Sequence, residues 1–108
     1  MLSAATAHGQ TKQIKHAIGK AARPYKIKGY VPEAGFVPDS VTAIRIAEAV
    51  WLPIYGNGIE QEKPFSARLR NGTVWVVNGF LPDGMRGGTA YIEINKQDGR
   101  VLYVMHSK

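Results

Sequence analysis

The side chains that could hold a metal ion are few and scattered. His8 and His16 lie near the N-terminus, and His106 lies at the opposite end of the chain. A metal site needs several ligands that converge, and the chain has no cysteine to add to these histidines. We therefore predict no metal centre, and we expect the histidines to be solvated or to cap backbone groups.

The acidic residues also fail to form a catalytic set. Most are predicted to lie at a helix start or in loops, namely Asp39, Glu60, Glu62, Asp83 and Asp98. Glu93 falls in a strand-like segment and could act as a general base, although an exposed strand glutamate is the more common case. Gly84, Gly87 and Gly88 precede a strand rather than the helix that a phosphate loop requires. We predict no catalytic residue and no cofactor.

The positive charge of the chain is concentrated near its start. The formal net charge is +6, and residues 1–38 hold six basic residues against Glu33 alone. Residues 39–108 are almost balanced, with eight basic and seven acidic residues. The basic arm is either a solvated segment or a contact surface for an anionic partner. It lacks the regular alternation of basic and aromatic residues that favours base stacking, so nucleic acid is not predicted as the partner.

The first residues leave the compartment open. Ala5-Thr6-Ala7 is similar to a signal-peptidase site and would then be the remnant of a trimmed export signal, which favours the periplasm. Alternatively it is an ordinary terminus of small residues, and the protein is cytoplasmic. No apolar run approaches the roughly 18 residues of a membrane-spanning helix, so no membrane insertion is predicted.

The elements that position these side chains follow from the apolar pattern. Residues 11–23 predict a short helix, and the Pro/Gly-rich residues 24–38 predict an extended connector. The next helix begins with Asp39 or Ser40 as its N-cap. Its apolar stripe consists of Ala43, Ile46, Ala47, Val50 and Ile54, flanked by Ile44 and Trp51. Pro53 is expected to bend the last turn, and Gly56 and Gly58 to let the chain leave the helix.

Two strands joined by a tight turn follow this helix. The segment "PFSARLR" alternates, Asn71-Gly72 predicts a type I′ turn, and "TVWVVNGFL" forms the returning strand. A two-residue loop pairs Leu69 with Val74 and Ala67 with Val76 on the core face. It also pairs Arg68 with Trp75 on the other face, where a cation–π contact could form.

Two further strands complete a four-stranded antiparallel meander. "TAYIEIN" places Ala90, Ile92 and Ile94 on the core face. If Gln97-Asp98-Gly99 forms the following loop, Leu102 and Val104 join the core face of the last strand. The residues that then face outward with Tyr91 are Val101, Tyr103 and Met105. A four-residue loop would exchange the two faces of this strand. The fold class is therefore α+β, one or more N-terminal helices packed on this curved sheet. We divide the chain into an arm, 1–36, and a domain, 37–108.

The outer sheet face is the best candidate for a binding site. It is predicted to gather residue types that are enriched in protein interfaces, namely Arg68, Arg70, Trp75, Val77, Tyr91, Tyr103 and Met105, with Arg86 in the neighbouring loop. Alternatively the N-terminal helix or a second subunit covers this face. A homodimer is thus compatible with the sequence.

Three stretches resemble a known family. "VPDSVTAIRIAEAVWLPIYG", "KPFSARLRNGTVWVVNGFLP" and "GGTAYIEINKQDGRVLYVMHSK" are similar to the nuclear-transport-factor-2-like fold immunity protein family of bacteria, over residues 37–108. The resemblance implies a cone-shaped fold of the cystatin-like or nuclear-transport-factor-2-like type. It also implies a non-enzymatic protein that binds and blocks a cognate toxin of a polymorphic toxin system used in interbacterial competition. Many relatives look exported, which favours the periplasm and a toxin that acts on the cell envelope.

Two other functions remain open from the sequence. "AYIEINKQDGRVLYV" is also similar to PepSY domains, which are associated with protease inhibition or cell-envelope regulation. An enzyme would need an acid–base pair inside the cone. The predicted core positions are apolar except for Asn78, which argues against an enzyme.

Overall fold

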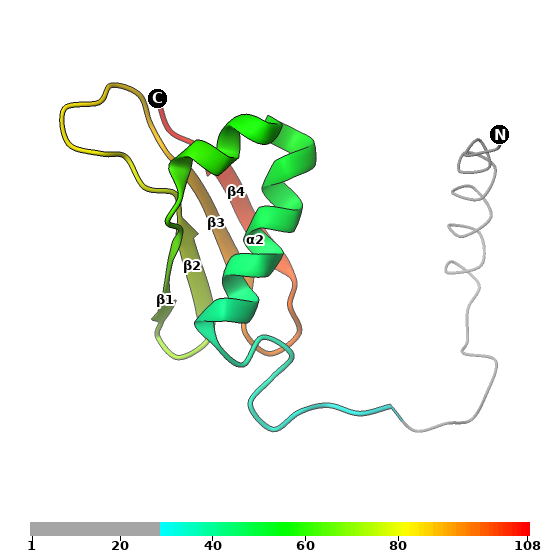
Figure 1. Cartoon of the computed structure of the whole chain (residues 1–108). Coiled ribbons are helices and arrows are strands. Elements are labelled where there is room, and N and C mark those ends of the chain that lie inside the picture. The colour runs from blue at the N-terminus through cyan, green and yellow to red at the C-terminus, as the bar shows by residue number, and fades with distance from the viewer. Residues whose placement is uncertain (1–28) are drawn as a thin grey trace, which may run out of the picture. The chain divides into compact units, whose positions relative to one another are not determined.

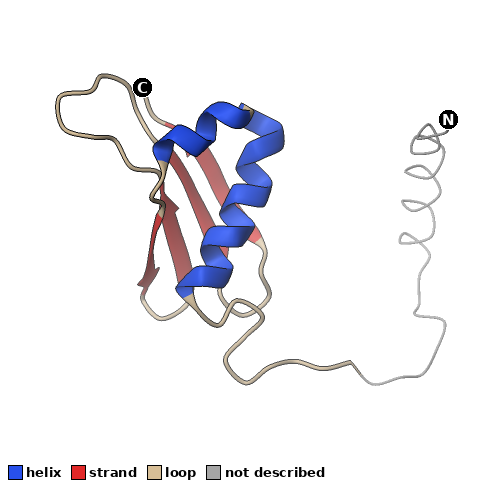
Figure 2. Cartoon of the chain, in the orientation of Figure 1, coloured by secondary structure: helices blue, strands red, loops and turns tan. Residues whose placement is uncertain are grey.

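The computed structural model describes residues 29–108, and its elements follow the predicted order. Helix α2 (Ser40–Tyr55) is followed by the 3-10 helix η1 (Asn57–Glu62) and by four strands: β1 (Ser66–Arg70), β2 (Val74–Asn78), β3 (Ala90–Asn95) and β4 (Val101–His106). The strands form one antiparallel sheet in the order β1-β2-β3-β4. Figures 1 and 2 show α2 lying across one face of this sheet. The α+β meander is confirmed. The predicted helix at 11–23, the Ala5-Thr6-Ala7 motif, His8 and His16 lie outside the described residues.

Helix α2 begins where the sequence predicts. The Asp39 carboxylate accepts a hydrogen bond from the Thr42 N–H at 2.8 Å, which is the expected N-cap geometry. The chain continues in helical form through Pro53 to Tyr55. It changes direction at Gly56, whose φ of 79° suits glycine and whose N–H donates to the Leu52 carbonyl at 2.8 Å.

The buried side of α2 advances by four residues at a time. Ala43, Ala47 and Trp51 are fully buried, and Tyr55 packs against the same core. Ile54 precedes Tyr55 by one residue and so points away from this buried side of the helix. It is 54% exposed, so its predicted place in the core is wrong. The helix packs on β1, β2 and β3, and the Trp51 ring meets the Phe65 ring edge-on at 5.1 Å.

The β1–β2 hairpin has one more loop residue than predicted. Asn71 and Gly72 have φ angles of 55° and 72°, as an Asn-Gly turn requires, and the Thr73 N–H donates to the Arg70 carbonyl at 3.1 Å. Arg70 nevertheless pairs with Val74, so Thr73 is an extra residue between the paired positions. Its carbonyl accepts a hydrogen bond from the Lys96 N–H at 2.8 Å instead.

This extra residue reverses the predicted faces of β2. Trp75 pairs with Leu69 and Ile94, and Val77 pairs with Ala67 and Ile92, so both lie on the core face. Trp75 is 8% exposed and Val77 is fully buried. The prediction of Trp75 and Val77 on the outer face is therefore wrong. Val74 and Val76, predicted in the core, lie on the face opposite α2 because a shift of one residue exchanges the two sides of a strand.

Strand β4 largely follows the prediction. Tyr103 pairs with Glu93 and Met105 with Tyr91 on the outer face, and Val104 packs against the core. A register shift opposite Glu93 and Ile94 makes Leu102 an extra residue between Val101 and Tyr103. Leu102 is 39% exposed, so its predicted burial in the core is wrong. Val101 pairs with the core-facing Ile94, so its predicted place on the outer face is also wrong.

The segment before α2 closes one end of the core. Val37 is 1% exposed, and its carbonyl accepts a 2.8 Å hydrogen bond from the Trp75 indole N–H. The N–H groups of Phe36 and Val37 donate to the Gln97 and Lys96 carbonyls at 2.9 and 3.0 Å. Gly35 has a φ of 89°, and a Cβ there would come within 2.5 Å of the Lys96 carbonyl oxygen, so only glycine fits.

Candidate partner-binding surface

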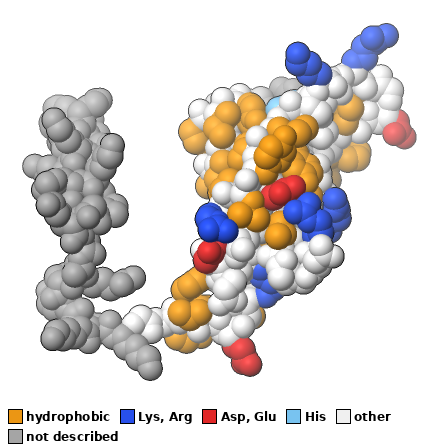
Figure 3. All heavy atoms as spheres, turned by 180° about the vertical axis from the view of Figure 1, so that it is seen from behind, with side chains coloured by type: hydrophobic (Ala, Val, Ile, Leu, Met, Phe, Trp, Pro, Cys, Tyr) orange, Lys and Arg blue, Asp and Glu red, His pale blue; other side chains and the backbone are white. Residues whose placement is uncertain are grey.

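The candidate surface is the sheet face opposite α2, called the outer face below. The register assigns to it every second residue of each strand: Ser66, Arg68 and Arg70; Val74, Val76 and Asn78; Tyr91, Glu93 and Asn95; Tyr103 and Met105. Within residues 29–108, no helix lies over this face (Figures 1 and 2). Figure 3 shows hydrophobic side chains on it with acidic and basic groups among them.

A small network of polar and aromatic side chains organises the middle of the outer face. One oxygen of the Glu93 carboxylate, Oε2, accepts hydrogen bonds from Arg70 Nη1 at 3.2 Å and from the Tyr91 hydroxyl at 2.6 Å. The Tyr91 ring meets the Tyr103 ring edge-on with centroids 6.1 Å apart. The Tyr103 hydroxyl donates to the Met105 sulfur at 3.7 Å. Side chains from β1, β3 and β4 are thus linked across the face.

These contacts fix the charge of the network. The hydrogen bond from Arg70, with a second one from Tyr91, holds the pKa of Glu93 below its usual range. The hydrogen bond to Glu93 raises the pKa of Tyr91, because it favours the protonated phenol. At neutral pH the network therefore carries one negative and one positive charge. Glu93 is half-buried and paired, so it is not the exposed strand glutamate that the sequence suggested.

Val76 lies beneath this polar layer. It pairs with Arg68 on one side and Glu93 on the other, and it is only 1% exposed. Since α2 lies on the opposite face of the sheet, side chains rather than a second layer of backbone account for this burial. Long charged side chains commonly cover apolar surface with their stems while their charged ends stay in water.

Arg68 differs from its neighbour Arg70. Its side chain is exposed, and within residues 29–108 it makes no ion pair or side-chain hydrogen bond. Arg86 lies away from the sheet, in the exposed loop between β2 and β3, next to Met85, which is 62% exposed. The structure therefore brings five of the predicted surface residues to the outer face: Arg68, Arg70, Tyr91, Tyr103 and Met105. Whether they contact a partner stays a prediction.

A second ion pair, which the sequence analysis misses, lies at the end of the sheet where β3 begins and β4 ends. Glu62 Oε2 lies 2.7 Å from His106 Nε2, and Glu62 Oε1 accepts a hydrogen bond from the Ala90 N–H at 2.7 Å. The Glu62 carbonyl accepts a third bond from the Phe80 N–H at 2.7 Å. The ring of His106 also meets the Tyr55 ring edge-on at 5.3 Å. Glu62 thus joins η1, the β2–β3 loop and the ends of two strands.

The charge of this pair depends on pH, because His106 is positive only when it is protonated. The hydrogen bond to Glu62 raises the pKa of His106 above the ordinary value of 6.5. The other ring nitrogen of His106, Nδ1, lies 2.8 Å from the Ser107 carbonyl oxygen. Of the two predicted roles, His106 therefore shows the contact to a backbone group and is not merely solvated. No local pattern reveals the pairing with Glu62, because the two residues are 44 positions apart.

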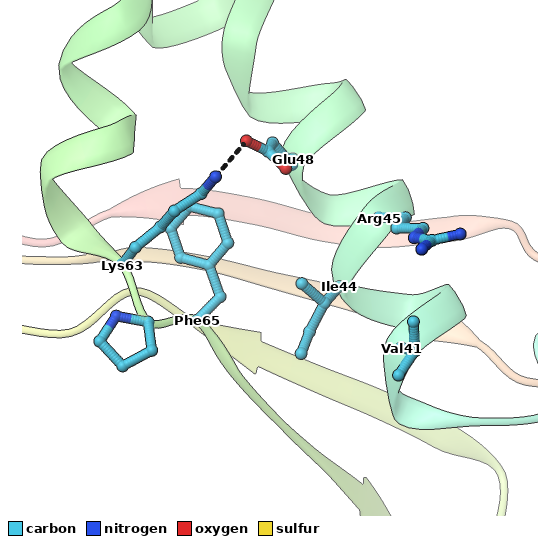
Figure 4. Close-up of a pocket in the computed structure, with 7 residues that line it drawn as sticks. Val41, Ile44, Arg45, Glu48, Lys63 and Phe65 are labelled. Atoms are coloured by element: carbon cyan, nitrogen blue, oxygen red, sulfur yellow. Dashed lines mark ion pairs between the residues drawn. The ribbon is translucent and has the colours of Figure 1, made fainter.

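An open groove lies between α2 and the start of β1 (Figure 4). Its volume is about 330 Å³, and it is lined by Val41, Ile44, Arg45, Glu48, Lys63, Pro64 and Phe65. Lys63 Nζ lies 3.2 Å from Glu48 Oε2 and 2.6 Å from Glu60 Oε1, so one cation bridges two carboxylates. The groove therefore presents an apolar floor with a charged rim.

Residues 29–108 contain no group of three or more histidine, aspartate or glutamate side chains that could hold a metal ion. Within the same range, no helix has the length and apolar character needed to cross a membrane.

Comparison with known proteins identifies the family. Residues 42–108 match the model of a family described as NTF2 fold immunity protein. The chain is 35% identical over 91 residues to the uncharacterized protein YhhH of Escherichia coli K12, an alignment that covers 82% of this chain and 71% of YhhH. It is also 42% identical over 74 residues to the uncharacterized protein YbbC of Escherichia coli K12. This second alignment covers 67% of this chain and 60% of YbbC. No solved structure matches. The chain belongs to the NTF2 fold immunity protein family.

Proposed function

We propose that this chain neutralises a cognate bacterial toxin by binding it with the outer face and so occluding the toxin's active site. Membership of an immunity protein family implies a toxin partner and favours a binding role over catalysis. The observation that supports the outer face is its composition: two arginines, two tyrosines and a methionine are gathered on one side of a single sheet. These residue types are enriched where proteins bind proteins.

The internal bonds of the outer face suit this role. Arg70, Glu93 and Tyr91 are held by one another, so part of the surface is already ordered before a partner arrives. An ordered surface loses less side-chain entropy on binding than a mobile one. The mechanism is then occlusion by a largely pre-formed face, without a chemical step.

The charge of the outer face favours an acidic partner surface. Residues 39–108 are almost balanced in charge, and on the outer face Arg68 adds an exposed cation to a network whose other charges cancel. An acidic patch around the active site of the toxin would complement this surface and speed the encounter. We expect the toxin to belong to a polymorphic toxin system used between neighbouring bacteria.

The periplasm is the proposed place of action. The observation that favours this compartment is Ala5-Thr6-Ala7, which is similar to a signal-cleavage site. A toxin met there would act on the cell envelope. Fractionation of the native host distinguishes the periplasm from the cytoplasm, which is the alternative.

Arg68→Glu tests the binding face directly. The toxin gene is expected directly upstream, so its product is the probe, and protection of toxin-expressing cells and affinity for the purified toxin are the readouts. We expect Arg68→Glu to weaken binding by about tenfold or more, since an interface arginine is a frequent hot spot. The matched control is Arg45→Glu, which reverses an exposed arginine on α2, on the other side of the sheet.

The two variants separate the outcomes. Loss of protection with Arg68→Glu alone supports the outer face, provided that the thermal unfolding temperature is unchanged. Equal affinity of both variants and the wild type for the toxin would move the binding site elsewhere. If the wild type itself neither binds the toxin nor protects cells from it, the proposed function is wrong.

A further inference from the structure

The free edge of β4 is the least protected part of the sheet. Within residues 29–108, β4 pairs with β3 on one side only, and its sequence Val-Leu-Tyr-Val-Met-His contains no lysine, arginine, aspartate or glutamate. Val101 and Leu102 are each 39% exposed and Tyr103 is 51% exposed. The one titratable group with charge near neutral pH, His106, is bound to Glu62 of its own chain. A strand edge that is largely apolar and exposed, without free charged side chains, tends to pair with another strand.

The opposite edge of the sheet carries the usual protection. β1 has Arg68 and Arg70 within its five residues and Pro64 two positions before it, whereas the charged residues nearest to β4, Arg100 and Lys108, lie outside the strand at its two ends. Charged side chains and proline are the devices that discourage edge-to-edge pairing. In addition, α2 packs on β1, β2 and β3. The two edges therefore differ in a way that points to β4 as the strand that accepts a partner.

The backbone groups of β4 that face outward follow from the ladder with β3. The Ser107 N–H donates to the Thr89 carbonyl at 3.0 Å, which marks these two residues as a hydrogen-bonded pair. Hydrogen-bonded pairs recur at every second residue of an antiparallel ladder, so Met105 and Tyr103 also point their backbone groups at β3. The N–H and C=O groups of Val104 and His106 consequently point away from the sheet.

We propose that β4 pairs antiparallel with β4 of a second copy of this chain, with Val104 on the twofold axis. In this register Val104 faces Val104 of the second copy, and the two residues exchange both backbone hydrogen bonds. Tyr103 then lies opposite Met105 of the second copy, and Leu102 opposite His106. The result is a continuous sheet of two four-stranded halves. This inference does not depend on the outer face binding a toxin.

Self-complementarity is the reason to choose a second copy. A twofold axis places each residue opposite one of the same strand, so an edge that carried lysine or glutamate could bring like charges together. β4 itself has no such residue, and in this register the basic residues Arg100 and Lys108 face each other only beyond the two ends of the paired strands. On the outer face, the pairing repeats between chains the tyrosine–methionine contact that Tyr103 and Met105 already make within one chain.

The first test measures the oligomeric state with a matched pair of variants. Leu102 and Leu69 are 39% and 40% exposed and lie on the two opposite edge strands. We expect the full-length wild type to sediment as a dimer, Leu102→Lys to lose the dimer, and Leu69→Lys to keep it. Circular dichroism checks that each variant folds. A wild type that is monomeric at every accessible concentration, or a Leu69→Lys variant that dissociates as fully as Leu102→Lys, would overturn the proposal.

The second test uses the absence of native cysteine. The chain contains none, so Val104→Cys introduces a single thiol. The Cα atoms of a hydrogen-bonded antiparallel pair are about 5.5 Å apart, which a disulfide can span. Mild oxidation should link two copies of Val104→Cys and leave the control Leu69→Cys unlinked. Equal linking of both variants, or of neither, contradicts the proposed register.

Discussion

Val76 and Val77 are neighbours in β2, and they are buried in two different ways. Val77 faces α2 and is fully buried among apolar side chains. Val76 faces the other side and is 1% exposed, yet the sheet is bare of helix there within residues 29–108. Nearly equal burial is thus reached once by a packed core and once by a layer of side chains that includes ionised groups.

This difference separates stability from recognition. On the core face, the polar group of Trp75 is satisfied by an uncharged partner, the Val37 carbonyl. On the outer face, Glu93 is held by Arg70 and Tyr91 in a network that water can reach. Burial of apolar surface is the larger stabilising contribution, whereas ion pairs near water contribute little. The core face should therefore carry the fold and leave the outer face free to serve binding.

Replacing Trp75 should have the largest effect on stability. Trp75→Ala removes a nearly buried indole and leaves the Val37 carbonyl without its hydrogen bond. Losses of about 3–5 kcal/mol are typical for such a change, which is a large part of the stability of a small domain. Denaturant unfolding measures it, and Trp75→Phe, which keeps most of the apolar volume, should lose clearly less. A loss below about 1 kcal/mol would mean that Trp75 is not part of the core.

The two valines of β2 give the sharpest comparison of the faces. Val77→Ala opens a cavity in a rigid core, so we expect a loss of about 2 kcal/mol. Val76→Ala should cost about half as much, because the side chains above it can move into the space. The measurement is the difference in free energy of unfolding between the two variants. Equal losses would show that the outer face is as tightly packed as the core.

The same strand shows where prediction from sequence reaches its limit. β1 and β3 alternate between apolar and polar residues, so their faces are predicted correctly from the pattern. Val74-Trp75-Val76-Val77 is apolar on both sides, so only the turn could decide which residues face the core. The Asn-Gly turn is present, but Thr73 adds one residue to the loop and reverses the strand.

The candidate site likewise contains residues that the sequence pattern predicts and contacts that it does not. Residues on the alternating strands β1 and β3, such as Arg68 and Tyr91, could be assigned to the outer face from sequence. Contacts between distant segments could not, because no periodicity connects Glu62 in η1 with His106 in β4. The cap at Asp39 was predictable, since an N-cap bond spans only three residues.

Each face of the sheet also has an ion pair, and the two should respond to pH in opposite directions. On the α2 side, the hydrogen bond to Glu62 raises the pKa of His106. A raised pKa in the folded state means that the stabilisation is complete below the ordinary value of 6.5 and is lost as pH rises through the folded value. His106→Gln should remove this part of the pH dependence, measured by unfolding at a series of pH values. If the wild type and the variant differ equally at all pH values, protonation of His106 does not stabilise the fold.

On the outer face, Glu93 should act in the acid range and with the smaller effect. The hydrogen bond from Arg70, and then that from Tyr91, lowers the pKa of Glu93, so its stabilisation is present above the ordinary value of 4.5 and is lost as pH falls through the folded value. Glu93→Gln should destabilise the protein slightly at neutral pH, less than Val76→Ala does, and should approach the wild type in stability below that range. The control is Glu33→Gln, which removes an exposed carboxylate that lies outside the sheet. A Glu93→Gln loss as large as that of Val77→Ala would mean that the network on the outer face, and not only the core, holds the sheet together.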